Sequence, residues 1–226
     1  MRFTDPGAAG RELAEKVEAR GSLAGAVVLA VARGGVPVAA EVAKRLRAPL
    51  DVVLVRRLLV PRGPEEPVCA VSVAGALVLD KELAARRAAR DDDDKENSAL
   101  ESFLAEALRE FEARTRACRG DRPPLDLSRR QVLLVDNGVR TGSTLRAVLR
   151  ALRTREPARV VAAFPVASVE GRASVAAVAD ESICLATPEP FGHVGLWYAN
   201  FERQDDRQIA AALDEAERAR GGLTRA

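Results

Sequence analysis

Residues 131–153 constrain the fold more than any other part of the chain. The first five, Gln131–Val135, predict a buried strand because four β-prone apolar residues follow Gln131, and Ser143–Arg153 carry apolar residues at the spacing of an amphipathic helix. The loop between them contains two glycines and begins with the polar pair Asp136-Asn137. A buried strand that passes through a polar, glycine-containing loop into a helix is typical of a parallel α/β sheet.

The same alternation of strand and helix recurs through most of the chain. Helical patterns are found at 8–20 and Val36–Leu46, and strand-like runs at 26–31, 51–55, 160–166 and 182–186. The first of these strands ends at the turn Arg33-Gly34-Gly35. The order predicts an open, doubly wound, mostly parallel α/β sheet, because a barrel would need eight such units.

A different kind of sequence separates the two halves of this pattern. Residues 60–67 are rich in proline and charge and predict a flexible loop, and 68–73 with 77–79 predict a hairpin around Ala74-Gly75. Ser98 and Glu101 form a capping box that predicts the start of an amphipathic helix ending near Gly120. We expect a single domain over 1–226 with these parts: a core over about 8–60 and 128–190, a loop, hairpin and helical insertion over 61–127, and an aromatic segment with a helix over 191–226.

Charge and composition narrow the class of partner. The 35 Lys and Arg and the 33 Asp and Glu leave a net charge of +2, which gives no electrostatic reason to expect nucleic acid or an anionic membrane as a partner. No apolar run approaches the roughly 20 residues of a membrane span, and residues 1–20 lack the apolar stretch of a signal peptide. We therefore expect a cytoplasmic protein that binds small molecules.

Few side chains are available for metal binding or for acid–base chemistry by imidazole. The only histidine, His193, excludes a metal site of several imidazoles, and Cys69, Cys118 and Cys184 lie too far apart for a zinc motif. We expect these thiols to be buried and free. Acid and base work would fall mainly to carboxylates or to the substrate.

The loop after Val135 has the composition of a phosphate site. The predicted phosphate-binding residues are Gly138, Val139, Arg140, Thr141, Gly142, Ser143 and Thr144. The backbone N–H groups of such a loop and the positive end of the following helix attract a phosphate, and Asp136 would then face sugar hydroxyls. Alternatively, Ser143 or Thr144 merely caps the helix, which leaves the pair Asp136-Asn137 unexplained. The loop is not a Walker A loop, because no Gly-Lys-Ser/Thr follows it.

Residues 132–145 resemble the phosphoribosyl pyrophosphate motif of type I phosphoribosyltransferases, in which a hydrophobic strand and two acids precede a Thr-Gly-x-Thr phosphate loop. The turn Arg33-Gly34-Gly35 stands where that family has its pyrophosphate loop, and Arg56-Arg57 stand where it keeps basic residues. The chain as a whole resembles a bacterial group of predicted phosphoribosyltransferases whose acceptor is unassigned. Shared features are the Arg-Gly-Gly turn, the Val-Leu-Val-Arg strand and a late Phe-x-x-Val-Gly-x-x-Tyr segment.

The resemblance implies a reaction and a set of roles. Phosphoribosyl pyrophosphate carrying Mg²⁺ would lose pyrophosphate from C1 while a small nitrogenous acceptor, such as a nucleobase, attacks. Residues 138–144 would hold the 5-phosphate, and Asp136 would hold ribose hydroxyls or the magnesium. The residues implied to face the pyrophosphate are Arg33, Gly34, Gly35, Arg56 and Arg57; for Arg56 and Arg57, ordinary surface charge is the alternative. The resemblance leaves open whether the protein is a homodimer. The Ala32–Arg33 peptide bond can be cis or trans, since the related loop often uses a non-proline cis bond.

Two positions of the predicted catalytic set, Asp136, Asn137 and Arg140, depart from the family pattern. Asn137 replaces the usual second acid, and an amide cannot supply the second negative charge near a metal. Arg140 places a cation beside the phosphate loop and cannot act as a general base. The sequence therefore leaves two readings: an active transferase, or a catalytically weak or inactive regulatory module that binds phosphoribosyl pyrophosphate or a nucleotide. An α/β enzyme of another phosphate-ester class is a more remote reading.

Four of the eight aromatic residues gather near the end of the chain, at Phe191, Trp197, Tyr198 and Phe201. The segment 191–195 is similar to one that stacks on the purine in hypoxanthine-guanine phosphoribosyltransferases, with one extra residue. On that resemblance the predicted acceptor-binding residues are Phe191, Val194, Trp197 and Tyr198. Alternatively, the rings fasten the C-terminal segment onto the core.

Overall fold

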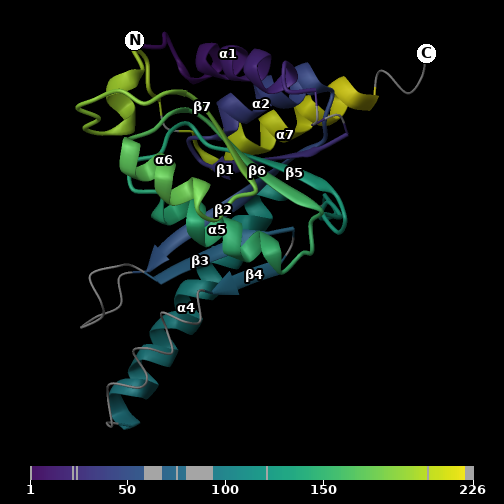
Figure 1. Ribbon diagram of the computed structural model, residues 1–226. Coiled ribbons are helices and arrows are strands. Elements are labelled where there is room, and N and C mark those ends of the chain that lie inside the picture. Colours follow the sequence, from purple (N-terminus) through teal and green to yellow (C-terminus); the bar gives the residue numbers. More distant parts are fainter. Residues whose placement is uncertain are drawn as a thin grey trace.

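The computed structural model describes residues 2–21, 23, 25–58, 68–74, 76–79, 94–120, 122–202 and 204–221 (Figure 1). Its centre is a seven-stranded sheet in the order β4-β3-β2-β1-β5-β6-β7. The strands are β1 Val27–Ala32, β2 Leu50–Leu58, β3 Val68–Val73, β4 Ala76–Leu79, β5 Gln131–Val135, β6 Arg159–Val166 and β7 Glu181–Ala186. No helix within the described ranges is long and apolar enough to cross a membrane.

Five of the strands are parallel neighbours, as the sequence pattern predicted. In the central register, Ala30 of β1 pairs with Val52 of β2 on one side and with Val135 of β5 on the other. β5 and β6 consist mostly of buried residues along their whole length. Continuous apolar runs of this kind are expected where helices cover both faces of a parallel sheet.

Helices cover both faces of the sheet, so the predicted doubly wound arrangement is confirmed. The helices are α1 Pro6–Glu18, α2 Val36–Leu46, α4 Asp94–Arg119, α5 Ser143–Arg153, α6 Val169–Ala176 and α7 Asp206–Gly221, with a 3₁₀ turn η1 Val194–Trp197. One core cluster packs α1, α2, α7 and the second half of α4 against one face, and another packs α5 and α6 against the opposite face. Figure 1 shows the first half of α4 extending away from the body of the molecule.

The predicted hairpin is present as β3 and β4, which pair antiparallel with Val71 opposite Val78. Gly75, at its predicted turn, lies outside the described residues. Helix α4 begins at Asp94, upstream of the predicted start at Ser98. The sequence from 94 to 97 contains no proline or glycine, so it allows the helix to begin one turn before the capping box.

A buried ion pair joins the end of α4 to the sheet. Arg119 donates from a guanidinium nitrogen to Oδ2 of Asp51 in β2 at 2.6 Å, and the two side chains are 7% and 6% exposed. Asp51 also accepts from the backbone N–H of Val52 at 2.7 Å, and Arg119 donates to the carbonyl of Pro123 at 3.2 Å. These bonds satisfy the buried charges, and they fix how the second half of α4 lies against β2.

In an open parallel sheet, a reversal of strand order opens a crevice at the carboxyl ends of the strands, and here the order reverses beside β1. From β1 the chain moves outward to β2, whereas β5, β6 and β7 follow one another in the other direction. The loops after β1 and β5 therefore leave the sheet toward opposite faces. In open parallel sheets, ligands bind at this reversal of strand order, at the carboxyl ends of the strands.

Candidate functional site

The two loops at the crevice, residues 33–35 after β1 and 136–142 after β5, are in direct contact. A Cβ atom on Gly34 would lie 2.9 Å from Cγ of Asn137 and closer still to its side-chain nitrogen. A Cβ atom on Gly35 would lie 2.7 Å from the carbonyl oxygens of Val31 and Val135. Glycine at both positions therefore allows the predicted pyrophosphate turn to lie against the predicted ribose motif. The Ala32–Arg33 peptide bond is cis, one of the two geometries that the resemblance left open.

The predicted phosphate loop leads into α5 without a capping side chain. Gly142 is the N-cap with a φ of 78°, a left-handed conformation that favours glycine, and it has no side chain to cap the helix. The N–H of Ser143 makes only a long bond, at 3.5 Å, to Oγ1 of Thr141. The interpretation of Ser143 or Thr144 as mere caps is therefore wrong. Within the described part of the chain, the backbone N–H groups of Arg140, Thr141 and Gly142 have no hydrogen-bond partner.

Unpaired N–H groups in a loop at a helix N-terminus form an anion site. The hydroxyl oxygens of Thr141 and Ser143 lie 3.1 Å apart, and both residues are exposed. Thr144, in the first turn of α5, is partly exposed. The loop therefore offers an approaching phosphate both backbone and hydroxyl donors.

Helix α6, which the sequence analysis did not predict, supports this loop. Val139 donates its N–H to the carbonyl of Val166 at 2.9 Å, and Ser168 donates its own N–H to the carbonyl of Val139 at 2.9 Å. The Ser168 hydroxyl donates to the carbonyl of Arg140 and accepts from the N–H of Gly171 at 2.8 Å. The side chain of Arg140 is exposed, so α6 fixes the backbone of the loop and leaves this cation at the surface.

Asp136 lies at the end of β5, where its N–H donates to the carbonyl of Ala163 at 3.1 Å. Burial raises the pKa of its carboxyl to about 7, and a hydrogen bond from the N–H of Asn137 at 2.8 Å lowers that pKa in part. Near neutral pH the carboxyl can therefore accept from, or donate to, a sugar hydroxyl. Its ionised form is a ligand for a hard cation.

The side chains of the described residues do not form a complete metal-binding site by themselves. In the described ranges no group of three or more His, Cys, Asp or Glu side chains is placed to hold a metal ion. Mg²⁺ is often held by one or two carboxylates together with substrate phosphates and waters. The single carboxylate of Asp136 fits that mode of binding.

The aromatic segment reaches the same crevice. A Cβ atom on Gly138 would lie 2.7 Å from Cγ1 of Val194, and the Tyr198 hydroxyl donates to the carbonyl of Asn137. Burial, with a smaller contribution from the charge of Asp136, raises the pKa of Tyr198 above its usual range. The Tyr198 hydroxyl therefore stays protonated and holds the loop as a donor.

The predicted acceptor-binding residues differ in exposure. Tyr198 is 1% exposed and Phe191 is 8% exposed, and both pack with Phe3, so these rings fasten the segment. Trp197 stacks on Phe191 at a centroid distance of 6.1 Å and donates its indole N–H to the Phe191 carbonyl at 3.0 Å. Val194 and Trp197 are partly exposed. Binding of an acceptor by these four residues stays a prediction.

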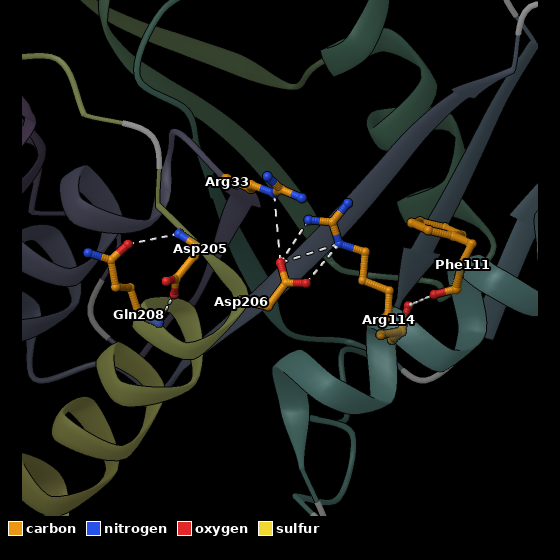
Figure 2. A network of polar contacts seen from close by, with 7 residues as sticks. Arg33, Phe111, Arg114, Asp205, Asp206 and Gln208 are labelled. Carbon is orange, nitrogen blue, oxygen red and sulfur yellow. Dashed lines mark hydrogen bonds and ion pairs between the residues drawn. The ribbon is translucent and has the colours of Figure 1, made fainter.

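The predicted basic residues border a cavity of about 500 Å³ beside the β1 loop. Its lining residues are Ala32, Arg33, Leu54, Val55, Arg56, Glu110, Phe111, Arg114 and Ile209. Arg56 pairs with Glu110 at 2.7 Å and donates to the carbonyl of Ala107 at 3.1 Å, while the side chain of Arg57 lies outside the described residues. Sequence reasoning had missed Arg114 on α4 and its ion-pair partner Asp206 on α7, which Figure 2 shows beside Arg33.

Known proteins resemble this chain along most of its length. Residues 7–198 match the model of the phosphoribosyl transferase domain. The protein named "Putative phosphoribosyl transferase Rv0571c" from Mycobacterium tuberculosis (strain ATCC 25618 / H37Rv) is 39% identical over 216 residues. That match covers 96% of this chain and 47% of the relative, so the chain spans about half the length of that relative.

Two solved structures have a similar fold. The crystal structure of TT1426 from Thermus thermophilus has a TM-score of 0.76 and 38% sequence identity, and the match covers 95% of this chain and 99% of that one. A hypothetical protein from Neisseria gonorrhoeae, solved with bound ppGpp, has a TM-score of 0.50 at 14% identity over 98% of each chain. At that identity the second likeness concerns the fold alone.

Proposed function

The chain belongs to the phosphoribosyl transferase domain family, and from this premise we propose that it binds phosphoribosyl pyrophosphate and transfers its ribose 5-phosphate to a small nitrogenous acceptor. The observation that carries the proposal is the 138–144 loop. It begins α5 at the reversal of strand order, and it keeps the N–H groups of Arg140, Thr141 and Gly142 unpaired. A 5-phosphate there would accept from these groups and from the hydroxyls of Thr141, Ser143 and Thr144.

The remaining roles follow from the positions of the two loops. Ribose hydroxyls would reach Asp136 at the end of β5, and the diphosphate would lie toward Arg33, Gly34 and Gly35 after β1. The acceptor nitrogen would form its bond to C1 as the C1–O bond breaks, and the electron pair of the broken bond would leave with pyrophosphate. The proton of that nitrogen would pass to a carboxylate or to an oxygen of the departing pyrophosphate. Because the protein needs to form no covalent bond, positioning and charge placement supply the catalysis.

Magnesium would enter with the diphosphate. Asp136 would hold it together with substrate oxygens and waters, and the ion would neutralise charge on the leaving group. Asn137 contributes no charge there, because an amide is neutral. The exposed cation of Arg140 lies next to the phosphate loop and would offset part of the phosphate charge.

A second function, binding without turnover, is favoured by one observation. Asn137 is 8% exposed and fills the space over Gly34, so the position where the family usually has a second carboxylate is closed by an amide. A regulatory module that senses phosphoribosyl pyrophosphate would keep the phosphate loop and dispense with that carboxylate.

The experiment that separates these functions combines calorimetric titration of phosphoribosyl pyrophosphate with a magnesium-dependent assay of pyrophosphate release across nucleobases. Binding with release supports the transferase, and binding without release supports the module. Replacing both Thr141 and Thr144 by Val should weaken binding by about 1–3 kcal/mol through lost bonds to a charged group. Thr154→Val is the matched control, because its hydroxyl bonds the carbonyl of Ala151 at the far end of α5. Absence of any binding to the natural protein would contradict both functions.

A further inference from the structure

The cavity beside the β1 loop contains more positive charge than the predicted residues supply. Arg33 comes from that loop, Arg56 from β2 and Arg114 from α4. Their side chains are 45%, 37% and 36% exposed, so a ligand can reach all three guanidinium groups. Leu54, Phe111 and Ile209 form apolar parts of the lining, which lower the local dielectric and strengthen a charge contact.

Asp206 holds two of these cations together (Figure 2). Its carboxylate accepts from the guanidinium of Arg114 at 2.7 Å and 3.1 Å, which makes a bidentate pair. The oxygen Oδ1 that takes the shorter of these bonds also lies 3.7 Å from Nε of Arg33. A single carboxylate oxygen thus lies near both cations and offsets their mutual repulsion.

The start of α7 fixes the position of Asp206. The N–H of Gln208 donates to the Asp205 carboxylate at 2.8 Å, and the N–H of Asp205 donates to the side-chain oxygen of Gln208 at 2.8 Å. This reciprocal capping box sets where the helix begins. Ile209 is 0% exposed and Leu213 is 2% exposed, so their side chains anchor α7 against the sheet. Asp206 is therefore placed by the fold and not by chance surface contact.

The opposite side of the cavity is fixed by α4. The buried pair of Arg119 with Asp51 anchors the end of that helix to β2, and Phe111 is 3% exposed in the core. Arg114, between them in sequence, is thus carried on a firmly packed turn. Three guanidinium groups against the carboxylates of Glu110 and Asp206 leave an excess of one positive charge around the cavity.

We propose that this cavity is a diphosphate site in which Arg114 is a third guanidinium donor beside Arg33 and Arg56. Asp206 is the internal counter-ion, which holds Arg114 and Arg33 in place until the diphosphate arrives. The inference rests on the proposed function, because it takes the diphosphate to be that of the substrate. Asp206 occupies the edge of Arg114 that carries Nε, and the other guanidinium donors of Arg114 remain for the ligand.

The test is calorimetric titration of inorganic pyrophosphate, and separately of phosphoribosyl pyrophosphate, into the full chain with Mg²⁺ present. Arg114→Gln should weaken binding of both by roughly 10- to 100-fold, the effect of losing a charge-assisted contact. Arg114→Lys, which keeps the charge and loses the planar fork, should fall between Gln and the natural protein. Arg116→Gln is the matched control on the same helix, because Arg116 is exposed and does not line the cavity. Its affinities should equal those of the natural protein.

A double variant distinguishes a direct contact between Arg114 and the diphosphate from mere neutralisation of Asp206 by Arg114. Arg114→Gln leaves Asp206 with only the longer contact to Arg33, so its less neutralised charge by itself repels pyrophosphate. Asp206→Asn removes a charge that repels pyrophosphate but also loosens Arg114, so this variant serves as the reference. With a direct contact from Arg114, the double variant Arg114→Gln with Asp206→Asn should bind pyrophosphate about tenfold more weakly than Asp206→Asn. A double variant that binds pyrophosphate as tightly as Asp206→Asn would show that Arg114 only neutralises Asp206, and would overturn the inference.

The outcomes also distinguish this inference from the proposed function. Phosphoribosyl pyrophosphate that binds equally to the natural protein and to Arg114→Gln would overturn the inference and leave the function standing. Pyrophosphate that binds with the expected dependence on Arg114, without binding of phosphoribosyl pyrophosphate, would overturn the function and leave the diphosphate site standing. Failure of the natural protein to bind either compound would overturn both.

Discussion

The side-chain amide of Asn137 occupies the space that a Cβ atom on Gly34 would need. These residues lie in the loops after β5 and β1, the two strands at which the strand order reverses. Contact between the loops couples the predicted ribose motif to the predicted pyrophosphate turn. A change on either side of the contact therefore moves both halves of the candidate site.

Gly34→Ala should destabilise the fold by about 1–3 kcal/mol, because it overpacks this contact. The three heavy atoms nearest the added methyl group all belong to the Asn137 side chain, so shortening that side chain relieves the clash. Gly34→Ala with Asn137→Ala should therefore recover most of the lost stability in urea unfolding. A double variant that is no more stable than Gly34→Ala would show that the strain lies elsewhere.

The buried pair of Asp51 and Arg119 should be costly to break from one side. Asp51→Asn leaves a guanidinium in the core without its counter-charge, and we expect a loss of about 3–5 kcal/mol in the free energy of unfolding. Asp51→Asn with Arg119→Met should lose less than the sum of the single changes. The exposed pair of Glu18 and Arg45 is the control, since water screens it and breaking it should change the free energy of unfolding far less. Equal losses for the two pairs would contradict the role given to burial.

The sequence predicted the helices, strands and turns that depend on apolar periodicity and on turn residues close together in the chain. The strand Gln131–Val135, its glycine loop and the helix Ser143–Arg153 follow from apolar periodicity and turn chemistry, and all three are present. Helix α6 was missed because only Gly171 and Val175 are buried among its eight residues. A helix with so narrow a buried face lacks the periodic pattern by which helices are predicted.

The charge cluster around Asp206 could not be predicted in the same way. Arg114 and Asp206 are 92 residues apart, and only the packing of α4 beside α7 brings them together. One local signal existed: Asp205 followed three residues later by Gln208 is the pattern of a capping box, and it marks the start of α7. That signal predicts a helix start and gives no information about its ion-pair partner.

Stability should fall as the pH rises from about 4 to about 7, through Asp136. The folded-state pKa of about 7 lies above the ordinary value of 3.8, so over this interval the folded chain keeps a proton that the unfolded chain has lost. The penalty is absent below pH 4 and constant above pH 7, with an upper bound of about 4 kcal/mol that solvent relaxation reduces. Asp136→Asn keeps the shape and removes the titration. The stability of this variant relative to the natural protein should therefore rise over that pH interval in thermal melts, and a flat difference would contradict the raised pKa.

Asn137→Asp should restore the carboxylate that the family pattern has at this position. The change is isosteric, so the contact with Gly34 can persist, and the added charge near the magnesium of the bound substrate should tighten its binding by about 1–4 kcal/mol. Pyrophosphate release with any accepted base should also become faster. Calorimetry with magnesium and phosphoribosyl pyrophosphate measures the first effect, and the release assay measures the second.

Arg140 needs its own variant, because its exposed cation beside the phosphate loop can stand in for part of the metal's charge. Arg140→Ala should weaken binding in the natural background. With Asn137→Asp it should make binding depend more steeply on magnesium concentration, since the ion then carries a larger share of the neutralisation. If neither Asn137→Asp nor the double variant binds more tightly or releases pyrophosphate faster than the natural protein, the missing acid does not limit turnover. The module that binds without turnover is then the better account, because its phosphate loop would be complete without a second carboxylate.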